Sequence, residues 1–239
     1  MSQDIANTKT MPSFAERFSA SPDVPVAKVP VAKRILDLTC LLLALPTLLP
    51  LFAVISAFIK IVSPGPIFFR QERVGFMGRK FQIFKFRSMH VDAETSTHQN
   101  HLKDLIGSDR PMVKMDSHGD PRVIKFGHIL RSSGLDELPQ LINVLRGEMS
   151  LVGPRPCTQY EYEQFQPWHK QRFRALPGLT GLWQVSGKNR TTFNAMINLD
   201  IRYANNWSIW LDLKIMLMTF PVLLSQVKEQ RNPRTKVNK

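Results

Sequence analysis

Apolar residues along the 239-residue chain form one long run, followed by shorter segments with strand-like and helix-like periods. The long run covers 35–59, with Asp37 as its only charge, and is long enough to cross a bilayer of ~30 Å as a straight helix. Pro46 and Pro50 interrupt it, and each proline removes a helical hydrogen bond and clashes with the preceding turn. The pattern therefore predicts a membrane helix over 33–60 that is kinked near its middle.

Basic residues flank this helix on both sides. They are Lys28, Lys33 and Arg34 before it, and Lys60, Arg70, Arg73, Arg79 and Lys80 after it. A spanning helix would carry one of these flanks across the membrane, against the preference for positive charge on the cytoplasmic side. A re-entrant helix, which dips into the bilayer and returns, keeps both flanks on the cytoplasmic side. We expect the re-entrant form, and an ordinary spanning helix remains the alternative.

The two ends of the chain are polar. Residues 1–32 are rich in Ser, Pro and Ala and lack an apolar stripe, which predicts a mobile N-terminal arm; they also lack the features of a signal peptide. Residues 228–239 form a basic C-terminal tail. The remaining segment, 61–227, is long enough for one folded domain.

Within 61–227 the pattern favours a small sheet followed by helices. Residues 67–70 and 81–89 predict short strands joined around Gly75 and Gly78. Helices are predicted over 160–174, 193–203 and 207–227. The last carries tryptophans, and its apolar stripe fits either a membrane surface or a protein core. The expected fold class is α+β: a kinked re-entrant membrane helix, then a small β-sheet and several interfacial amphipathic helices.

The chain is strongly basic. It has 32 Lys and Arg against 19 Asp and Glu, a formal net charge of +13, which indicates a nucleic acid, an anionic lipid or a phosphorylated substrate as partner. We predict no nucleic-acid partner, because the chain has no helix-turn-helix, zinc-finger or RNA-recognition signature. Cys40 and Cys157 are too few for a disulfide framework. The histidines His90, His98, His101 and His118 lack the spacing of a zinc site.

Two adjacent acidic residues, Asp136 and Glu137, begin a further predicted helix. Its apolar residues recur at i, i+3, i+4 and i+7, and they are Leu138, Leu141, Ile142 and Leu145. A helix N-terminus attracts anions, although acidic residues there often only cap the helix and complement its dipole. An ionised aspartate can act as a nucleophile, and Mg²⁺ prefers carboxylate and phosphate oxygens, so Asp136 and Glu137 could together move a phosphoryl group.

The segment 131–156 resembles the signature of the monotopic bacterial sugar transferases, the polyprenyl-phosphate phosphoglycosyl transferases. The matching residues are Arg131, the run Leu-Asp-Glu-Leu-Pro-Gln-Leu at 135–141, Asn-Val-Leu at 143–145 and Met-Ser-Leu-Val-Gly-Pro-Arg-Pro at 149–156. Similarity extends over 33–224 and includes 85–89, 120–122 and 177–185. The family kinks its re-entrant helix at a Ser-Pro pair, and here Pro50 follows Leu49 instead.

This resemblance implies a phosphoglycosyl transferase domain over 61–227 at the cytoplasmic face of the bacterial inner membrane. Asp136 is then expected to attack the sugar-linked phosphate of a UDP-sugar and to release UMP, and undecaprenyl phosphate to take the phosphosugar from the aspartyl intermediate. Glu137 is expected to bind Mg²⁺. The product would begin an exopolysaccharide or O-antigen chain. Two alternatives remain: Asp136 acting as a general base without a covalent intermediate, and a non-catalytic scaffold of a polysaccharide assembly complex.

Further residues are candidates for the same site. Arg155 lies between Pro154 and Pro156 and is the expected phosphate clamp, because its guanidinium matches phosphate oxygens. The other phosphate-binding candidates are Arg131, Lys85 and Arg87. The resemblance adds Pro154, Gln184, Asp200, Asp212 and Lys188, the last where the family often has arginine. The sequence leaves open which sugar is used and whether the chain forms a homodimer. Compared with larger members of the family, this chain is expected to lack their additional N-terminal spanning helices.

Overall fold

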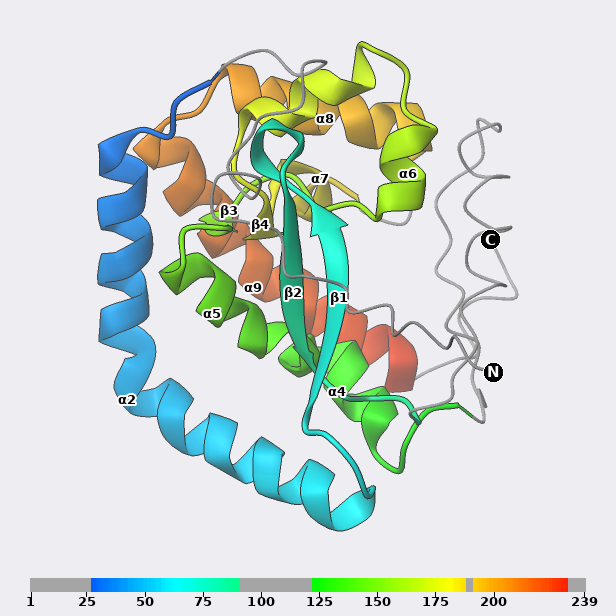
Figure 1. The fold of residues 1–239 in the computed structure, drawn as a ribbon. Coiled ribbons are helices and arrows are strands. Elements are labelled where there is room, and N and C mark those ends of the chain that lie inside the picture. The colour runs from blue at the N-terminus through cyan, green and yellow to red at the C-terminus, as the bar shows by residue number, and fades with distance from the viewer. Residues whose placement is uncertain (1–26, 91–121, 188–190, 232–239) are drawn as a thin grey trace, which may run out of the picture.

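The computed structural model describes residues 27–90, 122–187 and 191–231. One long helix runs down one side of the molecule and then along its base, and a β-hairpin stands in the middle with helices around it (Figure 1). The mixture of helices and small sheets agrees with the predicted α+β class. Lys188, the segment 91–120 and most of the two predicted arms lie outside the described residues.

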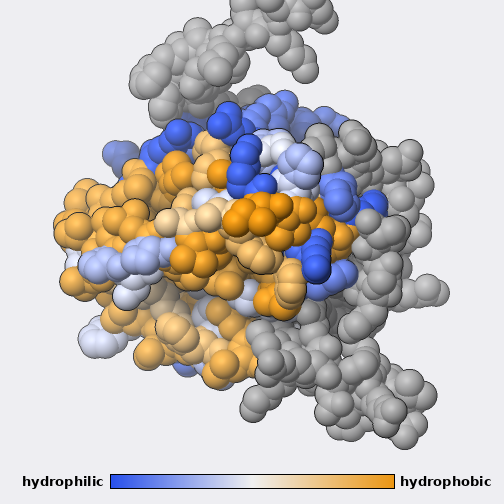
Figure 2. All heavy atoms as spheres, turned by 90° about the horizontal axis from the view of Figure 1, so that it is seen from below, coloured by the Kyte–Doolittle hydropathy of each residue, from blue (hydrophilic) through white to orange (hydrophobic). Residues whose placement is uncertain are grey.

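The long helix α2 (Val31–Val62) contains both prolines, Pro46 and Pro50. Its ribbon changes direction near the middle (Figure 1), and between the prolines the Thr47 hydroxyl donates to the Ala44 carbonyl at 2.8 Å. Among the described helices, α2 alone is long and apolar enough to cross a membrane. Many of its apolar side chains are exposed, including Leu42, Leu43, Leu49, Val54 and Ile61. From below, the side on which its second half lies, apolar side chains cover much of the described surface (Figure 2).

The inner face of α2 packs against the rest of the chain at two places. Leu41 joins a cluster with Ile83 and Met149, and Ile59 joins one with Phe86. All five side chains are almost fully buried. Burying one such side chain contributes about 1.5–3 kcal/mol. Both halves of α2 are therefore held by the same folded domain.

The β-hairpin consists of β1 (Phe68–Val74) and β2 (Lys80–Phe86), joined through a short 3₁₀ turn η1 (Phe76–Gly78). The strands are antiparallel, and Phe69 lies opposite Lys85. This confirms the predicted pair of strands joined around two glycines. The first strand extends further along the chain than predicted, and the second ends before residue 89.

A second sheet pairs β3 (Ser150–Val152) with β4 (Gly178–Thr180) in parallel. The Gly153 N–H donates to Thr180 at 2.8 Å, and the Gly178 N–H donates to Pro154 at 2.9 Å. A Cβ on Gly178 would lie 2.0 Å from the Gly153 nitrogen, so this close approach requires glycine. The sequence interpretation of 177–181 as a break in the chain was incomplete, because this segment contains a strand.

The helices after the hairpin are mostly short. They are α4 (Gly127–Ser133), η2 (Leu135–Gln140), α5 (Leu141–Leu145), α6 (Gln159–Glu163), η3 (His169–Arg174), α7 (Leu182–Val185), α8 (Phe193–Asn205) and α9 (Ile209–Arg231). Helices α8 and α9 confirm two predictions. The prediction of a single helix over 160–174 was wrong, because the chain forms α6 and η3 with Pro167 between them.

The predicted apolar stripe after Asp136 was also partly wrong. Leu145 is 52% exposed, whereas Pro139, Asn143 and Val144 are buried. The cause is the 3₁₀ geometry of η2, which has three residues per turn and therefore rotates the following side chains relative to an α-helix.

Candidate active site

The two carboxylates of the acidic pair lie in the first turn of η2. Gly134, between α4 and η2, has φ +73°, a left-handed conformation that glycine adopts without strain and that lets the chain turn between the two elements. Asp136 is buried, with 8% of its surface exposed, whereas the side chain of Glu137 is 40% exposed. The pair therefore combines a shielded carboxylate with a more open one.

Lys85 lies beside this pair. Its Nζ donates to Glu137 Oε1 at 2.8 Å, and it comes from strand β2. The structure thus brings together two of the residues selected from the sequence, one from the hairpin and one from η2.

Asn143 of α5 fixes this segment against the hairpin. Its Oδ1 accepts from the Phe84 N–H at 3.2 Å, and its Nδ2 donates to the Gln82 carbonyl at 2.7 Å. One buried amide side chain therefore satisfies both kinds of backbone group on the free edge of β2. This pairing sets the distance between Lys85 and η2.

The predicted phosphate clamp, Arg155, lies three residues after the end of β3. Its side chain is exposed, while its carbonyl accepts from Arg172 Nη2 at 2.8 Å. Pro154 is buried, and its carbonyl pairs with Gly178 of β4. The backbone of this motif is thus anchored on both sides of Arg155.

Asp200 supports Arg155 from within the domain. It lies on α8, is 1% exposed, and accepts a hydrogen bond from Arg172. Burial raises the pKa of Asp200 to about 6, although the guanidinium groups of Arg172 and Arg155 oppose this rise. The two partners form a buried ion pair that holds the Arg155 carbonyl.

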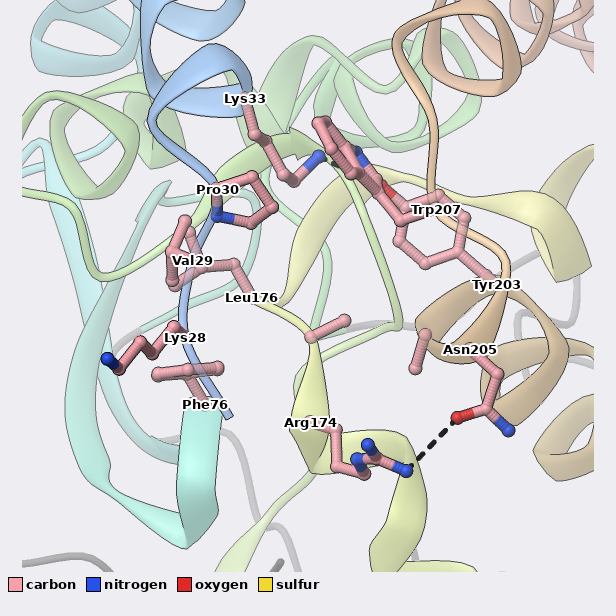
Figure 3. Close-up of a pocket in the computed structure, with 12 residues that line it drawn as sticks. Lys28, Val29, Pro30, Lys33, Phe76, Arg174, Leu176, Tyr203, Asn205 and Trp207 are labelled. Carbon is pink, nitrogen blue, oxygen red and sulfur yellow. Dashed lines mark hydrogen bonds between the residues drawn. The ribbon is translucent and has the colours of Figure 1, made fainter. Parts of the chain in front are cut away.

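Asp212 belongs to a different polar cluster. It accepts from Lys33 Nζ at 2.7 Å, the Tyr203 hydroxyl at 2.6 Å and Trp207 Nε1 at 3.0 Å. Lys33, Tyr203 and Trp207 also line a pocket of about 250 Å³ (Figure 3), which neither Asp136 nor Glu137 lines. Asp212 therefore joins the start of α2 to α8 and α9 through contacts of its own.

Helix α2 also holds β3, the strand that leads to Arg155. Lys33 Nζ donates to the Val152 carbonyl at 2.9 Å. Asp37 Oδ1 accepts from the Ser150 hydroxyl at 2.9 Å and the Leu151 N–H at 3.0 Å. Direct hydrogen bonds from α2 therefore fix β3, the strand that precedes the phosphate clamp.

We expect Asp37→Ala to lower the free energy of unfolding by about 1–3 kcal/mol, because buried donors on β3 lose their acceptor. Asp37→Asn keeps an acceptor oxygen and should recover at least half of the loss. Thermal unfolding of the detergent-solubilised variants measures both. Equal destabilisation by the two variants would contradict the role given to this acceptor.

The remaining predicted residues are placed as follows. Arg87 is buried and donates to the carbonyls of Ser63 at 2.6 Å and Pro64 at 2.7 Å, so its guanidinium holds the turn after α2. Arg131 lies in the last turn of α4. Gln184 Nε2 donates to the Leu179 carbonyl at 2.9 Å, which ties α7 to β4.

Comparison with known proteins identifies the family of this domain. The profile of the family described as bacterial sugar transferase matches residues 28–226. The chain belongs to the bacterial sugar transferase family. This confirms the resemblance drawn from the motifs and the prediction of an enzyme of the phosphoglycosyl transferase class.

Several bacterial sugar transferases are similar to this chain. Galactosyl transferase CpsE of Streptococcus agalactiae is 44% identical over 202 residues, which cover 81% of this chain and 42% of that relative. A UDP-glucose:undecaprenyl-phosphate glucose-1-phosphate transferase of Caulobacter vibrioides is 42% identical over 84% of this chain and 73% of that relative. Exopolysaccharide production protein ExoY of Sinorhizobium fredii is 37% identical over 81% of this chain and 85% of that relative. The chain thus spans less than half of the first relative and most of the other two.

Among the described residues of this sugar transferase, no group of three or more His, Cys, Asp or Glu side chains could hold a metal ion. Mg²⁺ does not need such a group, because it is commonly held by one or two carboxylates together with substrate phosphates. The partly exposed Glu137, next in sequence to Asp136, offers this kind of donor set. The residues present therefore fit Mg²⁺ bound together with a phosphorylated substrate.

Several residues that support the candidate site are not predicted by the sequence pattern. The pattern assigns no role to Arg172 and places Lys33 only in a basic flank. It identifies Asp37 only as the single charge in the apolar run, although a buried carboxylate there requires partners. That rule could have predicted a polar contact between α2 and the domain. The sequence contained no comparable signal for Arg172.

Proposed function

We propose that the chain transfers a hexose-1-phosphate from a UDP-hexose to undecaprenyl phosphate, giving undecaprenyl-diphosphate-hexose and UMP, as the first membrane step of exopolysaccharide or O-antigen synthesis. The relative from Caulobacter is named for this reaction with glucose. The observation that carries the proposal is the pair of a buried Asp136 and a more open Glu137, which lies 2.8 Å from Lys85. A non-catalytic scaffold would not need this arrangement of charges.

Asp136 is the nucleophile of the proposed reaction. One of its carboxylate oxygens bonds to the sugar-linked phosphorus, and the bond from that phosphorus to the UMP phosphate breaks, so that UMP leaves with the electron pair. An oxygen of undecaprenyl phosphate then bonds to the same phosphorus, and the bond to Asp136 breaks. The carboxylate is regenerated, and water is kept away from the intermediate by the burial of Asp136.

The charged groups around Asp136 have separate roles. Arg155, whose backbone is fixed and whose side chain is exposed, binds phosphate oxygens of the donor. Glu137 is the proposed ligand of Mg²⁺, which when bound neutralises charge on the diphosphate. Lys85 balances the charge of Glu137.

The position of α2 supports a re-entrant helix. Its start is tied to β3 through Lys33, and its second half packs through Ile59 against Phe86 of β2. A spanning helix would carry these two ends to opposite sides of the membrane, whereas here both contact one domain. With basic flanks at both ends, this domain lies on the cytoplasmic face and holds its carboxylates at the level of the lipid phosphates.

The experiment that tests the proposed function measures UMP release from a panel of UDP-sugars by purified protein with Mg²⁺ and undecaprenyl phosphate. We expect release with one UDP-hexose. Glu137→Gln should reduce the rate by about 10²- to 10³-fold, because the proposed carboxylate ligand of Mg²⁺, and with it charge neutralisation at the diphosphate, is lost. The matched control, Glu163→Gln on the exposed side of α6, should retain the wild-type rate. No release from any donor would contradict the proposal and favour the scaffold.

A further inference from the structure

Strand β1 places a second arginine on the face of the hairpin that carries Lys85. Phe69, Gln71 and Arg73 alternate along β1 and share one face, and Phe69 lies opposite Lys85. Arg73 and Lys85 therefore lie on the same face of the hairpin. Lys85 contacts Glu137 from this face, four residues along β2 from Phe81, the partner of Arg73.

The guanidinium of Arg73 is largely buried but only partly satisfied. Its side chain is 11% exposed. Nη2 donates to Gln71 Oε1 at 2.7 Å, and Nη1 lies 3.7 Å from Glu161 Oε2, beyond hydrogen-bond distance. Within the described part of the chain, the buried Nε has no hydrogen-bond partner. Glu161 also accepts from the Thr158 N–H in the capping box of α6, so its charge is shared.

The backbone segment that carries Arg73 pairs with the segment that carries Arg155. Val74 and Cys157 exchange backbone hydrogen bonds at 2.8 and 3.3 Å, which fixes the end of β1 beside the segment that begins with Arg155. Burial and then the charge of Arg155 lower the pKa of Arg73, and the charges of Glu161 and Glu137 oppose this. Two guanidinium groups that repel each other favour an anion that contacts both.

We propose that Arg73 is a further substrate-binding residue, which together with Arg155 binds the diphosphate of the nucleotide-sugar donor. This inference rests on the proposed function and names the group of the donor that the hairpin recognises. The unpartnered Nε of Arg73 supplies a donor in the planar fork that matches two phosphate oxygens. A diphosphate offers oxygens on two phosphorus atoms, enough for one guanidinium each.

The test measures the dissociation constant of UDP by calorimetry, with Mg²⁺ and without lipid acceptor, for wild type and Arg73→Gln. We expect Arg73→Gln to weaken UDP binding by about 10- to 100-fold, because charge-assisted hydrogen bonds are lost. KM for the UDP-hexose should rise by a similar factor, while kcat changes by less than about 3-fold. Arg73→Lys keeps the charge without the fork and should recover part of the affinity.

Arg70→Gln is the matched control, since Arg70 lies on the same strand but on the opposite face, where its guanidinium lies over the Phe84 ring. It should bind UDP as wild type does. Unchanged UDP affinity in folded Arg73→Gln would overturn the inference, and so would an equal loss of affinity for uridine, which has no phosphate. If wild type binds UDP but releases no UMP, the proposed function fails, whereas a loss of UDP affinity in Arg73→Gln would still support diphosphate binding.

Discussion

Asp136→Asn is expected to abolish UMP release, with a fall in rate of about 10⁴-fold or more, because an amide cannot replace the carboxylate as nucleophile. The substitution is nearly isosteric, so the protein should still fold. The assay is UMP release with the preferred UDP-hexose, Mg²⁺ and undecaprenyl phosphate. UDP binding should remain within a few-fold of wild type, which separates loss of chemistry from loss of binding.

Survival of activity in Asp136→Asn would remove Asp136 from the reaction in either role, nucleophile or general base. A fall in rate accompanied by unfolding would require a second substitution, and Asp136→Ser provides it. Serine is smaller and polar, and we expect it to be equally inactive. An active, folded Asp136→Ser would contradict the assignment in the same way.

Arg172→Met should produce the largest loss of stability, about 3–5 kcal/mol in the free energy of unfolding. The substitution removes the only cation hydrogen-bonded to Asp200 among the described residues and leaves that carboxylate buried. It also frees the Arg155 carbonyl, so activity should fall as well. Denaturant unfolding in detergent micelles measures the stability change.

The double variant Arg172→Met with Asp200→Leu should be more stable than Arg172→Met alone, because it removes the unpaired charge together with its partner. The control is Lys80→Met, which breaks a pair with Glu72 whose side chains are 52% and 49% exposed. An exposed pair contributes about 0–1 kcal/mol, so little change is expected. A destabilisation by Arg172→Met no larger than that of Lys80→Met would contradict the proposed role of the buried pair.

The sequence predicted those elements whose pattern is local. The strands around Gly75 and Gly78 and helices α8 and α9 follow from alternation and helical period within each segment. Strand β4 was missed, because Gly178 pairs with residues of β3 that are distant in sequence. The prediction that Leu145 belongs to a buried apolar stripe was wrong, because the 3₁₀ geometry around Pro139 changes the number of residues per helical turn.

The acidic pair is a candidate from the sequence alone because its motif is contiguous, and the hairpin places Lys85 beside Glu137. The residues that support the site come from distant segments. Arg172 reaches Asp200 and the Arg155 carbonyl from η3, and Lys33 reaches Asp212 from α2. The residue spacing within one segment cannot predict contacts with a distant segment, so these contacts are known only from the folded structure.

The most direct test of the central claim, that Asp136 takes up the phosphosugar, is intact-protein mass spectrometry after incubation with the preferred UDP-hexose and Mg²⁺ but without lipid acceptor. The predicted result is an increase by the mass of one hexose phosphate, located at Asp136 by peptide mapping and lost when undecaprenyl phosphate is added. An unmodified protein that nevertheless releases UMP rapidly once the acceptor is present would contradict the covalent mechanism and favour direct transfer to the lipid.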